Sequence, residues 1–209
     1  MLLGCGSNGV PDHEATKAPN EVLSDASKAL RGAQSYRVTG TLDPGFSVNL
    51  VVVPTGSRGT VTVHGVTWNE VTVGGRTWFR GAKLWQATVS KARAAAYDDH
   101  WVLVRRPRAA FGFAGRIAHL HESIPGVVFG PQQGLSNTGA RKLNRERVVE
   151  LVSDSDIYDV QASDPHYPVR WLEKENPGPD GSPCGITIDA FNQPVTVPPP
   201  KTTLELTSG

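Results

Sequence analysis

Apolar and polar side chains alternate between residues 36 and 80, and this alternation constrains the fold more than any other feature of the chain. The run from Thr60 to Val63 alternates strictly, and the same pattern extends from Tyr36 to Leu42. Successive side chains of a strand point to opposite faces of its sheet, so a period of two predicts strands with one apolar face. Asp43-Pro44-Gly45 and Gly74-Gly75 are typical turn sequences. The segment is therefore predicted to form consecutive antiparallel hairpins.

The composition agrees with a mainly β structure. Valine occurs 24 times and isoleucine five times, and the chain contains 22 glycines and 16 prolines. Valine packs well on a pleated surface, and frequent glycine and proline imply many turns. One irregularity is expected within the hairpins: Val71 and Val73 are out of phase with Trp68, which predicts a β-bulge near Asn69 and Glu70.

Helical patterns precede and interrupt the strands. Residues 20–31 carry apolar side chains at helical spacing, with Asn20 as the expected N-cap and Gly32 as the stop. Two further helices are expected at residues 87–97 and 107–123. The remaining strands are predicted at 101–104, 145–152, 156–162, 167–174 and 186–191.

A single sheet that contains all of these strands must curl, and its concave side needs to be covered. We therefore expect an α+β fold that is mainly β: a strongly curved antiparallel sheet, or half-open β-barrel, covered on its concave side by the helices. No long linker divides the chain, so residues 20–200 are assigned to one domain and residues 201–209 to a C-terminal tail.

Charge and hydropathy argue against two classes of function. The formal net charge is +1 and the isoelectric point is about 7.8. Proteins that bind nucleic acid usually carry a basic domain or stripe, so no nucleic-acid partner is expected. No apolar run reaches 18 residues, so no membrane-spanning helix is predicted. The chain is expected to be a monomer.

The N-terminal segment suggests a lipid anchor. Leu2-Leu3-Gly4-Cys5 resembles a lipobox, in which the cysteine becomes the acylated first residue, and residues 1–5 are interpreted as a signal-peptide remnant. Residues 6–19 are polar and predict a flexible tether. Two alternatives stay open: a four-residue match can arise by chance, and Cys5 could instead form a disulfide with Cys184.

Three groups of residues are candidates for chemistry. His119, His121 and Glu122 could suggest a metal site, but histidines two positions apart diverge on a helix and two further ligands would be needed. Asp98-Asp99-His100 invites an acid–base interpretation, although aspartate at such a junction usually caps or turns the chain. Cys184 has no nearby histidine or lysine in the sequence to lower its pKa. The chain is therefore expected not to be an enzyme, and no cofactor or metal is expected.

The region from 105 to 147 is rich in arginine and lysine. It can be interpreted as a basic rim for anionic lipid headgroups or a membrane surface, or as an ordinary solvated face. The basic residues are Arg105, Arg106, Arg108, Arg116, Arg141, Lys142, Arg145 and Arg147.

Short tags along the chain carry a resemblance to a known family. They follow the lipobox and the alanine-rich helix in the order Val71–Gly75, Trp78–Gly81, Trp101–Val104, Tyr167–Trp171 and Phe191–Pro198. In this the chain resembles the mycobacterial lipoproteins of the LppX/LprA/LprF/LprG group, which are similar in fold to the lipoprotein carriers LolA and LolB. The resemblance implies a hydrophobic cavity that carries or presents acyl chains of a lipid or lipoglycan in the cell envelope. It also implies a lipid-anchored location at the extracytoplasmic face of the cell membrane.

The apolar strand and helix residues are the candidates for the cavity wall, although each of them could equally be packed core. They are Val38, Val48, Leu50, Val52, Val61, Val63, Trp68, Val71, Val73, Trp78, Phe111, Ile117 and Leu120. RseB-type regulators are similar in fold, so the alternative function is a regulatory or scaffold lipoprotein that binds a protein partner.

Overall fold

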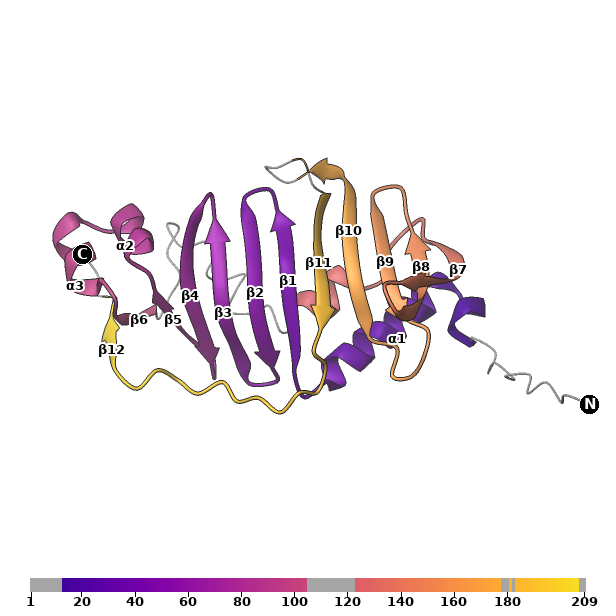
Figure 1. Ribbon diagram of the computed structural model, residues 1–209, viewed down its shortest axis with the longest axis horizontal. Coiled ribbons are helices and arrows are strands. Elements are labelled where there is room, and N and C mark those ends of the chain that lie inside the picture. The colour runs from indigo at the N-terminus through magenta and orange to yellow at the C-terminus, as the bar shows by residue number, and fades with distance from the viewer. Residues whose placement is uncertain (1–12, 105–122, 178–180, 182, 207–209) are drawn as a thin grey trace, which may run out of the picture.

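The computed structural model of this chain describes residues 13–104, 123–177, 181 and 183–206. Within these residues, twelve strands form one continuous sheet in the order β12-β6-β5-β4-β3-β2-β1-β11-β10-β9-β8-β7 (Figure 1). The first half of the sheet contains β1 (Tyr36–Asp43), β2 (Phe46–Val53), β3 (Gly56–Val63), β4 (Val66–Val73), β5 (Arg76–Arg80) and β6 (Trp101–Val104). The second half contains β7 (Ser136–Leu143), β8 (Glu146–Val152), β9 (Asp156–Gln161), β10 (Pro168–Pro177) and β11 (Pro183–Asp189). The short strand β12 (Thr203–Glu205) pairs parallel with β6, and every other pair is antiparallel.

The two halves meet at the centre of the sheet, where β1 pairs with β11 and Val38 lies opposite Ile188. The backbones approach closely here, because a Cβ atom on Gly40 would lie 2.1 Å from the carbonyl oxygen of Gly185. Gly40 also has a φ of +144°, which favours glycine. The sheet curves but its end strands, β7 and β12, do not pair with each other. The predicted mainly β fold with a curved open sheet is confirmed.

The hairpin at Gly74 and Gly75 is also confirmed. The φ angles of these residues are +56° and +73°, so both adopt the left-handed conformation that glycine tolerates. The bulge predicted near Asn69 and Glu70 is wrong, because the register of β4 continues without a shift against both β3 and β5. Glu70 instead lies on the same face of β4 as Trp68, with the exposed Asn69 between them, and is buried.

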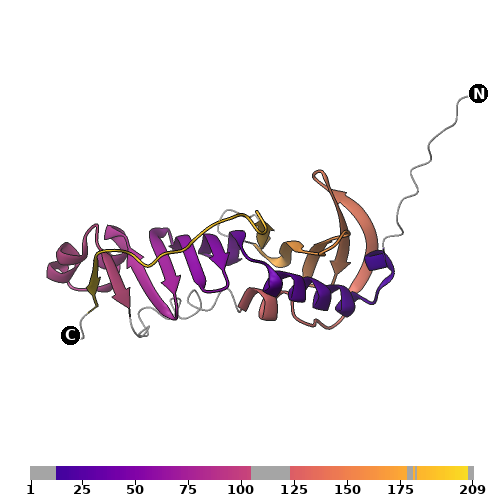
Figure 2. The ribbon, with the colours of Figure 1, turned by 90° about the horizontal axis from the view of Figure 1, so that it is seen from below.

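One face of the sheet, called here the inner face, carries the main hydrophobic cluster. The helix α1 (Pro19–Gly32) contributes Val22, Leu23 and Leu30 to this cluster and packs on β9 and β10 (Figure 2). The helices α2 (Ala82–Thr88) and α3 (Lys91–Tyr97) add further buried side chains at the β5–β6 end. Helices thus cover the sheet at both ends of this face.

The opposite, outer face carries a smaller cluster on the first half of the sheet. Residues 190–202, called here the strap, begin with a turn and then run past the ends of β1–β4 to β12, on the side of the sheet away from α1 (Figures 1 and 2). Val195 and Val197 of the strap pack with Val71 and Trp78. The strap therefore shields apolar side chains that the first half presents away from α1.

Several boundaries differ from the sequence-based expectation. The helix α1 begins after Ala18, whose N–H donates to the Glu21 carboxylate at 3.3 Å, so the expected cap at Asn20 is wrong. The single helix expected at 87–97 is two helices, α2 and α3. Strand β7 was not anticipated. Residues 203–205 of the predicted tail form β12. The helix expected at 107–123 lies outside the described residues except for Ser123, which precedes the π-helical turn η3 (Ile124–Val128).

Candidate functional site

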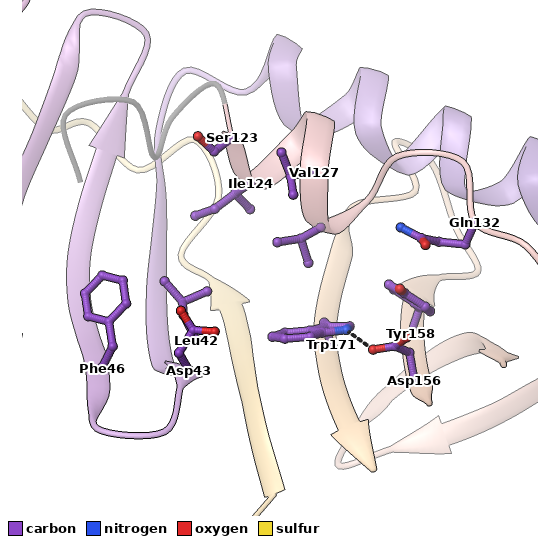
Figure 3. A pocket seen from close by; sticks show the side chains of 11 residues that line it. Leu42, Asp43, Phe46, Ser123, Ile124, Val127, Gln132, Asp156, Tyr158 and Trp171 are labelled. Carbon is purple, nitrogen blue, oxygen red and sulfur yellow. Dashed lines mark hydrogen bonds between the residues drawn. The ribbon is translucent and has the colours of Figure 1, made fainter. Parts of the chain in front are cut away.

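A pocket of about 550 Å³ lies between the β1–β2 turn, the η3 turn and strands β9 and β10 (Figure 3). Its size falls in the range typical of ligand-binding clefts. The lining residues are Leu42, Asp43, Phe46, Ser123, Ile124, Val127, Val128, Gln132, Asp156, Tyr158 and Trp171. Most of these side chains are apolar or aromatic, so the pocket suits an apolar ligand.

The α1 helix fixes the position of the η3 side of the pocket. The Ser27 hydroxyl donates to the carbonyl oxygen of Pro125 at 2.7 Å. The Asn20 side chain donates to the carbonyl oxygen of Gln132 at 3.0 Å and accepts from its backbone N–H at 2.9 Å. Ile124 is fully buried, whereas Val127 is 72% exposed. The turn therefore carries one anchored side and one side that presents an apolar side chain to solvent.

The sheet side of the pocket is formed by aromatic side chains with satisfied polar atoms. Figure 3 shows Trp171 beside Tyr158, with the Trp171 Nε1 atom donating to Oδ1 of Asp156 at 2.8 Å. The Ser155 hydroxyl donates to the other carboxylate oxygen of Asp156 at 2.5 Å. Burial raises the pKa of the Tyr158 hydroxyl above its ordinary value, so it stays protonated at neutral pH. The Asp156 carboxylate and the Trp171 indole N–H at this wall are thus already hydrogen-bonded within the protein.

None of the predicted cavity residues that the structure describes lines this pocket. Val38, Val48, Leu50, Val52, Val61 and Trp68 lie in the inner cluster, and Val63 packs against it. Val71, Val73 and Trp78 lie in the outer cluster beneath the strap. Phe111, Ile117, Leu120 and Cys5 lie outside the described residues.

Four of the pocket residues lie on strands or beside a turn that the sequence predicts, although the sequence does not mark them as pocket residues. Leu42 and Phe46 flank the predicted turn at Asp43–Gly45, and a side chain beside a turn lies at the rim of a sheet. Tyr158 and Trp171 lie opposite each other on β9 and β10. Alternation alone marked all four as members of strands but did not indicate that an opening lies above them.

The groups weighed for chemistry have structural roles where they are described. Asp99 has a φ of +57° in the turn after α3 and accepts hydrogen bonds from the Arg80 guanidinium, with its side chain exposed. Cys184 is fully buried on β11. In the described part of the chain, no three histidine, cysteine, aspartate or glutamate side chains gather as metal ligands. His119, His121 and Glu122 lie outside it.

On the described strands of the sheet, two fully buried carboxylates lie away from the pocket, one in each half. In the first half, Glu70 accepts hydrogen bonds from the hydroxyls of Ser57, at 3.1 Å, and Thr72. Burial raises the pKa of Glu70 to about 7. In the second half, Asp159 accepts from Arg141 at 2.7 Å and from Arg170 at 2.6 Å. Burial raises the pKa of Asp159 even though both arginines favour its charged form.

Neither a model of a known protein family nor the sequence of a curated protein matches the chain. The fold, an open curved sheet with few helices, is similar to that of LprF, a mycobacterial lipoprotein. LprF from Mycobacterium bovis is 17% identical, with a TM-score of 0.57 over 87% of this chain and 96% of that chain. The Mycobacterium tuberculosis lipoprotein LppX is 13% identical, with a TM-score of 0.49 over 87% of this chain and all of that chain. The resemblance predicted from the sequence is thereby confirmed for the fold. In the described part of the chain, no helix is both long and apolar enough to cross a membrane.

Proposed function

We propose that this chain is a cell-envelope lipoprotein that binds acyl chains of a lipid or lipoglycan in the pocket beside η3. The observation that carries the proposal is the pocket itself: mainly apolar and aromatic walls of about 550 Å³, with the exposed Val127 at its lining. The fold shared with LprF supports the same class of protein.

Apolar contact alone can hold such a ligand. Each buried methylene of an acyl chain contributes about 0.8 kcal/mol, so insertion of part of one long chain gives useful affinity. No buried, unpaired charge is then needed for recognition. This agrees with a pocket wall whose Asp156 and Trp171 are hydrogen-bonded to each other.

The proposed location is the extracytoplasmic face of the cell membrane, with Cys5 as the acylated residue. Stable anchoring takes more than one chain, which a multiply acylated lipoprotein cysteine supplies. Cys5→Ala tests this in the protein expressed with a complete signal sequence. The wild type should partition into detergent and the variant into the aqueous phase. Equal partitioning into the aqueous phase would refute the anchor.

The ligand is tested by native mass spectrometry of the protein purified from its own host. We expect a mass excess that disappears on denaturation and that extraction identifies as acyl lipid. Finding no lipid on correctly folded protein would overturn the proposal and favour the alternative, a lipoprotein that uses the same fold to bind a protein partner.

Two tryptophan substitutions locate the ligand. Val128→Trp fills the pocket beside η3 and should remove most of the bound lipid. Val63→Trp places the same bulk on the inner face outside the pocket, where overpacking costs about 1–3 kcal/mol without displacing the ligand. Circular dichroism verifies folding of both variants. Lipid lost from Val63→Trp but kept by Val128→Trp would place the ligand among the inner-face strand residues that the sequence predicts for the cavity wall.

A further inference from the structure

The chain just before α1 is held against the second half of the sheet. The η1 turn (His13–Thr16) packs on β7, where the Asn137 amide donates to the carbonyl oxygens of Glu14, Ala15 and Lys17 at 3.1–3.4 Å. The Glu14 side chain is fully buried, accepts from Lys17 and lies 3.3 Å from Nε2 of His166. Residues 14–17, which we call the docked arm, therefore belong to the folded domain.

The docked arm shortens the link between Cys5 and the domain. Glu14 follows Cys5 by nine positions. Even fully extended, that length of chain spans only about 30 Å. An acylated Cys5 thus keeps the β7 end of the molecule within about 30 Å of the bilayer surface, and a coiled linker of this length would bring it closer, to roughly 15–20 Å.

The β7–β8 hairpin projects from this same end of the molecule, on the side away from α1 (Figure 2). From Asn137 to its tip, the hairpin extends about 20 Å. The tip carries three exposed cations, Lys142, Arg145 and Arg147, and one exposed carboxylate, that of Glu146. Among the described residues, no carboxylate lies within ion-pair distance of Lys142 or Arg145. The tip is therefore a cationic surface within reach of the membrane to which the chain is proposed to be anchored.

We infer that the β7–β8 tip binds the anionic headgroups of that bilayer, so that the β7 end of the domain faces the membrane surface. This inference rests on the proposed anchor at Cys5. The partner is a surface of anionic lipid, which the positive charge of the tip attracts. The docked arm holds the tip close enough for that weak, salt-screened attraction to act.

The test couples the anchor chemically, so that it does not depend on acylation in the cell. Because Cys184 is fully buried, a maleimide-bearing lipid in a vesicle reacts at Cys5 of the folded protein. Hydrogen exchange of the backbone amides at residues 143–147 is then compared on phosphatidylcholine vesicles with and without phosphatidylglycerol. We expect slower exchange on the anionic vesicles, returning to the neutral-vesicle rate in high salt.

Charge variants identify the tip as the contact. Lys142→Gln with Arg145→Gln should lower the protection of the tip about tenfold or more, since each basic residue contributes substantially near an anionic surface. The matched control, Arg76→Gln on β5 with Lys91→Gln on α3, removes the same charge from exposed residues at the other end of the molecule and should leave the protection unchanged. Asn137→Ala, which releases the docked arm, should reduce the protection while both tip cations remain.

The inference is overturned if the tip amides exchange at the same rate on both kinds of vesicle. It is also overturned if the tip variant and the control variant lower the protection of the tip equally. The acyl-chain pocket is measured separately. Loss of lipid in Val128→Trp with intact tip protection would leave both proposals standing. Tip protection with no lipid in the wild-type protein would overturn only the proposed ligand.

Discussion

The two halves of the sheet bury a carboxylate in different ways. In the second half, Asp159 is paired with two guanidinium groups, those of Arg141 and Arg170. In the first half, Glu70 faces only the hydroxyls of Ser57 and Thr72. Burial raises the pKa of both carboxylates; at Asp159 two positive charges oppose that rise, whereas at Glu70 only the weaker hydrogen bonds of two hydroxyls do. The second half thus buries a carboxylate among opposite charges, and the first half buries one whose pKa is near neutrality.

Removing Asp159 should have the largest effect, because it leaves two partly buried guanidinium groups without their shared partner. We expect Asp159→Ala to lower the free energy of unfolding by about 3 kcal/mol. Arg141 and Arg170 retain some solvent contact, which keeps the loss at the lower end for a broken buried pair. Urea unfolding measures this difference.

The control is Asp99→Asn, which removes the charge of the exposed pair with Arg80 and keeps a residue that tolerates the positive φ at this position. That change should cost less than about 1 kcal/mol. Equal losses in the two variants would contradict the compensation assigned to the second half.

Glu70 should make the free energy of unfolding fall as pH rises towards neutrality. Its folded pKa, about 7, lies above the ordinary value of 4.5. The unfolded chain therefore releases its proton first as pH rises, and the contribution of Glu70 to stability is lost between about pH 4.5 and 7. Glu70→Gln stays neutral, so it should match the wild type near pH 4 and exceed its free energy of unfolding by about 2–3 kcal/mol at pH 8.

Urea unfolding of both proteins across this pH range gives the difference directly, since the contributions of all other groups cancel. Glu146→Gln, which neutralises an exposed carboxylate on β8, serves as the control for the loss of one negative charge. A difference between wild type and Glu70→Gln that is independent of pH would argue that Glu70 is charged throughout.

The smallest effect is expected at the β4–β5 turn of the first half. Both Gly74 and Gly75 have positive φ angles and space around them, so conformation alone opposes a side chain. Replacing both with valine should cost about 1 kcal/mol per residue, measured by thermal unfolding. Gly32→Ala, at the end of α1 with ordinary φ and open space, should be neutral or slightly stabilising. Unchanged stability of the double valine variant would mean that the turn can adopt another conformation.

Sequence reasoning succeeded where local chemistry decides the structure. The hairpins follow from turn residues such as Gly74 and Gly75 and from strict alternation on either side. It failed at Glu70, because Val71 and Val73 are apolar on the opposite face from Trp68. That change of phase predicts a bulge unless it is known that Val71 and Val73 pack under the strap and that Glu70 accepts from the hydroxyls of Ser57 and Thr72. It also missed β7, an edge strand whose two faces are both largely polar and which therefore shows no alternation.

The candidate pocket was less predictable than the fold. Its walls come from the β1–β2 turn, η3, β9 and β10, which are separated by long stretches of chain. Phe46 and Trp171 are ordinary strand residues by pattern, and only the position of η3, held by Ser27 of α1, leaves space beside them. A pocket between elements depends on such tertiary contacts, which residue spacing does not encode.

The pairing of β1 with β11 at the centre of the sheet has a consequence for how the chain folds. Each half consists mainly of neighbouring hairpins that close short loops and can form early. The central ladder, by contrast, joins Val38 to Ile188 and cannot form until almost the entire chain has been synthesised. Until then β1 is an open edge whose apolar residues could pair with another chain. The closing of this ladder is therefore expected to be the slow step of folding, and newly made chains are most prone to aggregate before it.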